Sequence, residues 1–208
     1  MRGRRLYPGG VLFAIFCLIV AGWPVSVAAH GSGSSGSQAG IPIPSFTYGE
    51  MAVISPYYGR IISLAESISD TDETFRRLLN FAQIQRAYCL WGVMPGSVSD
   101  EESPFNECSH AYLAAAKAVL LQMRAMKVEK EPVDDLVSDI DLALVRNNLS
   151  LIRCKFSGEN FNTADLIRPK LADIALHAKS LAAILSASLF VLAGLWLGAR
   201  ALRPQAQS

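Results

Sequence analysis

The chain has 208 residues, a length typical of one domain, and 51% of them are hydrophobic. Lysine and arginine together number 19, against 18 aspartate and glutamate residues. All 18 acidic residues lie between His30 and Ser180, where only 14 basic residues accompany them. Proteins that bind nucleic acid normally carry a basic face, so this acidic middle argues against a nucleic-acid partner.

Residues 1–29 have the pattern of a secretory signal peptide. Three arginines among the first five residues precede a twelve-residue apolar run, Val11–Gly22, and small residues follow it. This order predicts cleavage after Ala28 or Ala29. The alternative is a signal that stays attached as an anchor, although twelve apolar residues are well short of the roughly 20 that span a bilayer.

Residues 30–44 are rich in glycine, serine and proline, and we expect them to form a flexible linker outside the fold. The domain is then expected over residues 45–180. Its apolar residues recur at three- and four-residue steps almost throughout, and no window shows the alternation typical of strands. The fold class predicted is all-α, a bundle of about four helices.

Start signals divide this domain. A serine and proline at positions 55 and 56 predict the first helix. Asp70–Glu73 provides a cap and an acidic first turn for the second helix, which runs to Cys89. Because the second helix is apolar around much of its girth, we expect it at the centre of the bundle.

The third helix is predicted to begin near Ser103 and the fourth at Glu131, where proline again follows the capping position. The fourth is expected to continue to about Gly158. A last helix begins either near Asn162 or at Pro169. In the second case it would run without a break into the C-terminal apolar segment.

Three cysteines remain after the signal: Cys89, Cys108 and Cys154. Outside the cytoplasm thiols are usually oxidised, so a disulfide is expected. Cys89 ends the second helix and Cys108 lies early in the third, so both occupy the same end of an antiparallel hairpin. This favours a Cys89–Cys108 bridge, while a pairing that involves Cys154 and the absence of any bridge stay open.

A metal site is the alternative use of Cys108. His110 lies two residues further on, but residues two apart point in different directions on a helix. The spacings that structural zinc uses, C-x-x-C and H-x-x-x-H, do not occur. Met123 and Met126 are soft ligands of the kind that copper prefers, but at helical spacing we expect them in the core. We therefore predict no metal site.

Residues 181–199 form a second apolar segment, nineteen residues without a charge. At about 1.5 Å per residue this covers roughly the 30 Å hydrocarbon thickness, which predicts a single C-terminal transmembrane helix. Residues 200–208 form a short tail with Arg200 and Arg203 and no acidic residue, so the positive-inside rule places this tail in the cytoplasm. The domain would then lie outside the cytoplasm, as the signal peptide also requires.

Gly194 and Gly198 form a G-x-x-x-G motif within this segment. Small residues four apart let two helices approach closely in lipid, so these two glycines are the predicted helix-pairing residues.

No G-x-S-x-G, phosphate-loop or dinucleotide motif occurs, and we expect neither catalysis nor a cofactor. The function predicted is that of a non-enzymatic assembly, accessory or interaction subunit, single-pass in the plasma or inner membrane, with a periplasmic domain if the cell is Gram-negative. Its expected partners are the bilayer, other membrane or envelope proteins, and itself through the transmembrane helix. The alternative is a membrane-tethered domain that binds a ligand or copper through Met123, Met126, His110 and a free cysteine.

Overall fold

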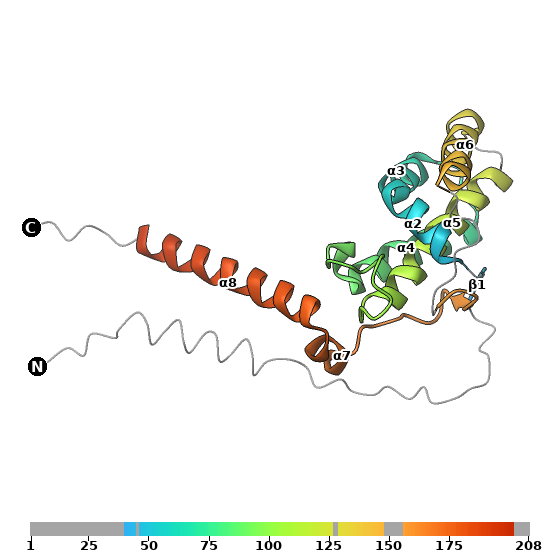
Figure 1. Cartoon of the computed structure of the whole chain (residues 1–208). Coiled ribbons are helices and arrows are strands. Elements are labelled where there is room, and N and C mark those ends of the chain that lie inside the picture. The colour runs from blue at the N-terminus through green and yellow to red at the C-terminus, as the bar shows by residue number, and fades with distance from the viewer. Residues whose placement is uncertain (1–39, 45, 127–128, 148–155, 202–208) are drawn as a thin grey trace, which may run out of the picture. The chain divides into compact units, whose positions relative to one another are not determined.

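The computed structural model describes residues 40–44, 46–126, 129–147 and 156–201. Helices dominate these residues, so the predicted all-α class is confirmed (Figure 1). The predicted signal peptide, most of the linker, Cys154 and the tail beyond Ala201 lie outside the described residues.

Most elements begin within a few residues of their predicted starts. In chain order the structure has β1 (Pro42–Ile43), α2 (Tyr48–Ile54), the 3-10 turn η1 (Ser55–Tyr57), α3 (Tyr58–Ser67), α4 (Glu73–Tyr88), the 3-10 turn η2 (Leu90–Gly92), α5 (Asn106–Met126), α6 (Lys130–Arg146), β2 (Phe161–Asn162), α7 (Leu171–Leu176) and α8 (Ala178–Ala201). The predicted continuation of α6 to Gly158 falls largely on residues 148–155, which lie outside the described ranges.

The fold begins before residue 45, within the predicted linker. β1 pairs with β2 in an antiparallel register that sets Ile43 opposite Phe161, and both side chains are buried. Phe46 is buried as well. Proline is tolerated as the first residue of a strand, so Pro42 does not prevent this pairing. One core residue, Ile43, therefore lies within the proline-containing segment that was predicted to be a linker.

α2 lies within the predicted domain but was not predicted as a helix, because the first start signal was placed at Ser55 and Pro56. Thr47 caps it, because its hydroxyl accepts a hydrogen bond from the Glu50 amide and the Glu50 carboxylate accepts one from the Thr47 amide. This reciprocal arrangement is a capping box. Ser55 and Pro56, which were expected to begin the first helix, lie instead in η1, a short turn between α2 and α3.

The centre of the bundle is α5, and the expectation that α4 would be central is wrong. α5 packs against α2, α3, α4 and α6. Alanines at positions 111, 114, 115 and 116 of α5 are buried, and their small side chains let neighbouring helices pack closely against it. α4, by contrast, leaves Ile84 and Tyr88 exposed.

An ion pair between Glu50 and Lys117 joins α2 to α5. Burial raises the pKa of the Glu50 carboxyl, but hydrogen bonds from Lys117 and the Thr47 backbone outweigh it, so the pKa lies below its usual value. A carboxyl with a lowered folded-state pKa stabilises the fold at neutral pH, and this contribution is lost as the pH falls through that pKa.

The last helix is not one continuous rod. α7 ends at Leu176, His177 is extended with φ −91° and ψ 101°, and α8 begins at Ala178. The His177 Nδ1 atom accepts a hydrogen bond from the Ser180 amide at 3.3 Å, which caps the new helix. α8 is long and apolar enough to cross a membrane, and none of its apolar window is buried against the rest of the structure.

We expect Thr47→Ala to lower the free energy of unfolding by about 1 kcal/mol, because the α2 cap is lost. Thermal denaturation of the full chain in detergent measures this effect. Thr47→Ser keeps the hydroxyl and is the matched control. Equal stability of the alanine and serine variants would contradict the capping role.

Candidate functional site

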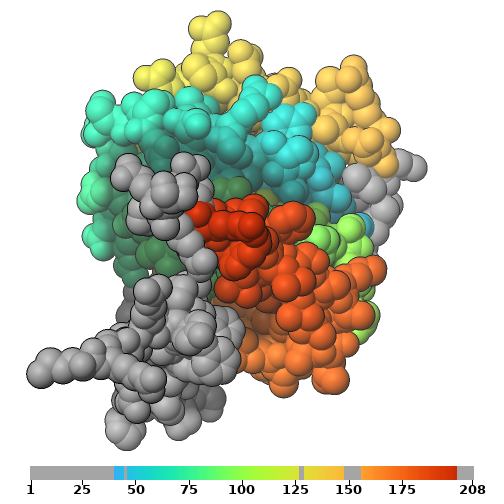
Figure 2. Space-filling model, turned by 90° about the vertical axis from the view of Figure 1, so that its left-hand side faces the viewer, coloured from blue at the N-terminus to red at the C-terminus, as the bar shows by residue number. Residues whose placement is uncertain are grey.

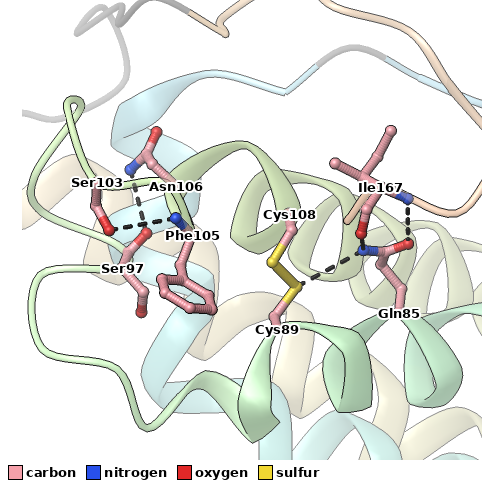
Figure 3. Close-up of a disulfide and its surroundings, with 8 residues drawn as sticks. All are labelled: Gln85, Cys89, Ser97, Ser103, Phe105, Asn106, Cys108 and Ile167. Atoms are coloured by element: carbon pink, nitrogen blue, oxygen red, sulfur yellow. Dashed lines mark hydrogen bonds between the residues drawn. A yellow bond between two sulfur atoms is a disulfide. The ribbon is translucent and has the colours of Figure 1, made fainter. Parts of the chain in front are cut away.

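Cys89 and Cys108 lie at bonding distance, with 2.07 Å between their sulfur atoms and 5.8 Å between their Cα atoms (Figure 3). Cys89 directly follows α4, and Cys108 lies in the first turn of α5. Both are fully buried. The structure thus has the antiparallel hairpin and the cysteine placement that the predicted disulfide requires. The residues between them, 90–107, are called the bridged loop below.

The bridged loop is held by hydrogen bonds along its length. The side-chain amide of Asn106 donates to the carbonyls of Ser97 and Val98, at 3.2 and 3.4 Å. The Phe105 amide donates to the Ser103 hydroxyl at 3.3 Å, and Figure 3 shows this contact beside the Asn106–Ser97 bond. Because Phe105 is also buried, the loop is packed on the bundle and not merely solvated.

The start of the bridged loop has an uncommon backbone. Leu90, Trp91 and Gly92 have consecutive positive φ angles of 50°, 54° and 70°. Two hydrogen bonds close this turn, from the Gly92 amide to the Cys89 carbonyl and from the Val93 amide to the Leu90 carbonyl. Side chains on left-handed backbone are disfavoured, so the surrounding contacts have to hold this conformation in place.

Gln85 fastens the segment before α7 to the bridged hairpin. Its side-chain Nε2 donates to the Ile167 carbonyl at 2.7 Å, and its Oε1 accepts from the Ile167 amide at 2.9 Å (Figure 3). The same Nε2 lies 3.6 Å from the Cys89 sulfur. Gln85 is fully buried, so these bonds satisfy a polar group that would otherwise be costly in the core.

Asp100 in the bridged loop joins the start of α8. Its Oδ2 lies 2.7 Å from the Lys179 Nζ and 3.5 Å from the His177 Nε2. The hydrogen bond from Lys179, followed by smaller electrostatic contributions, keeps the pKa of the Asp100 carboxyl below its usual value. The contact is therefore present at neutral pH and is lost as the pH falls through this lowered pKa.

A groove of about 490 Å³ lies between the bridged loop and the α7 segment. Its lining combines carboxylates, cations and apolar side chains. The residues are Glu101, Glu102, Ser103, Pro104, Glu107, Phe156, Ile167, Arg168, Pro169, Lys170, Asp173, Leu176 and His177. We call the bridged loop, the Gln85–Ile167 contact and the Asp100 contacts together the base of α8, because they surround the residues from which this helix begins.

The residues named as ligands in the alternative copper-site hypothesis do not come together as a metal site in the described structure. Cys108 is bound to Cys89, and the His110 ring is buried between Phe46 and Phe156, at centroid distances of 6.1 and 6.0 Å. Burial lowers the pKa of His110 to about 4, so this ring is neutral at physiological pH. Met123 is fully buried. Among the described residues, no three histidine, cysteine, aspartate or glutamate side chains gather as metal ligands.

Gly194 and Gly198 lie on α8. A Cβ atom built at either position meets no other atom within 4 Å, so the surface beside both glycines is open. Figure 2 looks toward the C-terminal end of α8, whose red atoms are visible on this face of the molecule. The two predicted pairing residues are thus accessible, and the two predicted disulfide cysteines are buried.

Gln85, Asp100 and His177 were not predicted from the sequence as contact residues. A signal for Gln85 was present, since it is a polar residue on the same helical stripe as Ala82 and Cys89. Asp100 had no such signal, because acidic loop residues are usually solvated.

No known protein family, curated protein or solved structure matches this chain. The geometry of the described residues is therefore the basis for assigning a function.

We expect the oxidised full chain to gain two hydrogens in mass on reduction, and Cys154→Ser to gain the same. Closure of a loop of this length stabilises by about 3 kcal/mol in the chain-entropy model, so reduction should lower the melting temperature clearly. Intact-mass spectrometry and thermal denaturation measure the two effects. An unchanged mass on reduction would contradict the bridge.

We expect Asp100→Asn to loosen the bridged loop, because the amide loses the attraction of Lys179. A glutamate-specific protease should then cleave after Glu101 or Glu102 several-fold faster than in the native chain at neutral pH. Asp70→Asn removes the same charge from the turn before α4 and is the control. Equal cleavage in all three proteins would show that the Asp100 contact does not hold the loop.

Proposed function

We propose that this protein is a single-pass membrane subunit that displays its helical domain outside the cytoplasm and acts by contacts with other membrane components. The observation that carries this proposal is the surface of α8. Residues 181–199 of this helix carry no charge, and long apolar side chains such as Leu189 and Phe190 are exposed. A soluble protein rarely exposes such a continuous apolar surface, whereas a bilayer or a partner helix would cover it.

The glycines of α8 favour contact with a second helix. Glycine in a helix interior is about 1 kcal/mol less favourable than alanine, so two glycines one turn apart weaken the helix unless they serve packing. In lipid, helices associate by close packing at small residues. The open surface at Gly194 and Gly198 supports such packing.

The charges after α8 and the buried cysteines support the proposal that the helical domain lies on the extracytoplasmic side of the membrane. The basic residues Arg200 and Arg203 follow the apolar run, and arginine is retained on the cytoplasmic side. A buried disulfide at Cys89 and Cys108 is typical of a protein outside the cytoplasm. Both features agree with an extracytoplasmic domain.

We expect the double variant Gly194→Leu/Gly198→Leu to lose self-association or partner association, because leucine side chains prevent close helix approach. Blue-native electrophoresis and crosslinking of membranes that contain the full chain measure the assembled mass. The expected result is a shift to monomer mass, with the same amount of protein in the membrane fraction.

Ser188→Leu/Ala199→Leu is the matched control, since these positions lie about a third of a turn away from the glycine surface. This control should keep the native assembled mass. An assembly that survives leucine at both glycines would overturn pairing through α8. Release of the native chain by alkaline carbonate would overturn the membrane assignment itself.

A further inference from the structure

The bridged loop exposes two large apolar side chains next to buried ones. Trp91 is 61% exposed and Val93 is 74% exposed. Cys89 and Met94 on either side of them are buried, so the loop is not simply turned toward solvent. An exposed tryptophan and an exposed valine that lie beside buried residues of the same loop favour a contact surface here.

The backbone that presents Trp91 is strained. Leu90 and Trp91 both have left-handed φ angles, a conformation that is unfavourable for residues that have a side chain. The Cys89–Cys108 bond and the two hydrogen bonds of the turn hold this conformation. Strain that the surrounding structure maintains is characteristic of functional positions.

The same loop is fixed to the start of α8. Asp100 binds Lys179 in the first turn of α8, and Figure 1 shows the loop after α4 (green) beside this point. Tyr88, the last residue of α4, accepts a hydrogen bond from Arg168 on its hydroxyl at 3.2 Å. The first contact holds the bridged loop at the first turn of α8, and the second holds the end of α4 beside the segment that precedes α7.

α7 adds further exposed apolar residues at this location. Leu171 is 76% exposed and Leu176 is 85% exposed. The break at His177 separates α7 from α8, so the two helices do not form one continuous rod. Lys170 and Lys179 flank α7 with positive charge.

We propose that Trp91, Val93, Leu171 and Leu176 insert into the headgroup region of the bilayer from which α8 emerges. Tryptophan prefers this region because its ring is apolar and its N–H group needs a polar partner. Lysine and arginine beside it attract lipid phosphates. The proposal rests on α8 crossing the membrane, and it adds a second, peripheral contact that sets the tilt and rotation of the domain above the lipid.

Tryptophan fluorescence of the full chain in vesicles of phosphatidylcholine and phosphatidylglycerol tests this surface. The variant Trp23→Phe/Trp196→Phe leaves Trp91 as the single tryptophan. Lipids brominated near the headgroup should quench Trp91 several-fold more than lipids brominated near the chain end, and aqueous acrylamide should quench it weakly. Leu176→Trp with Trp91→Phe in the same background should behave in the same way.

The control is Val145→Trp with Trp91→Phe in the same background, since Val145 is an exposed apolar residue on α6, which packs against α2 and α5. Acrylamide should quench this control strongly and brominated lipid hardly at all. If Trp91 matches the control while carbonate leaves the chain in the vesicles, the lipid-contact surface is overturned and the membrane span stands. If Trp91 is shielded from acrylamide in native membranes but not in the lipid vesicles, the surface contacts a protein partner, and the proposal is overturned as well.

A chain that carbonate releases from the vesicles overturns both the proposed membrane span and this surface.

Discussion

The covalent link between Cys89 and Cys108 is the constraint on which the arrangement of this protein depends. It joins the end of α4 to the first turn of α5, the helix around which the bundle packs. The disulfide therefore restricts the conformations of the bridged loop at both ends. Hydrogen bonds within the loop and the burial of Phe105 hold the residues between. A loop fixed in this way can act as a structural platform for the segments that contact it.

Contacts from α4 and from the bridged loop hold the C-terminal part of the chain. Gln85 binds both backbone polar groups of Ile167 beside the Cys89 sulfur. Asp100 binds Lys179 at the beginning of α8. The Gln85–Ile167 contact is buried and uncharged. The Asp100–Lys179 contact is charged and depends on ionisation of Asp100. The base of α8 therefore combines an attachment that does not depend on pH with one that weakens as the pH falls.

The sequence predicted the features that depend on local pattern. A cap was predicted within Asp70–Glu73, and in the structure Asp72 provides it. The apolar period of α4 and α5 and the charge-free run of α8 are likewise patterns that recur within one or two turns of helix. The juxtaposition of Cys89 and Cys108 follows from two adjacent antiparallel helices. Pairing at Gly194 and Gly198, and the orientation in the membrane, stay predictions.

The remaining features depend on residues far apart in the chain. Gln85 and Ile167 are separated by 82 positions, and Asp100 and Lys179 by 79. No local period encodes such contacts, because a buried glutamine and an acidic loop have many possible partners. The break at His177 was missed for a related reason, since neither glycine nor proline marks it and its cap comes from a histidine side chain.

The central claim is that the bridged loop is fixed at the base of α8. The most direct test is the distance between spin labels attached to ketone-bearing residues at Ser99 and Ala182, with the native cysteines unchanged, in the full chain in lipid nanodiscs. Pulsed electron paramagnetic resonance at neutral pH should give one narrow distance distribution, which broadens when Asp100→Asn is introduced. A broad distribution in the native chain, unchanged by that substitution, would contradict the account.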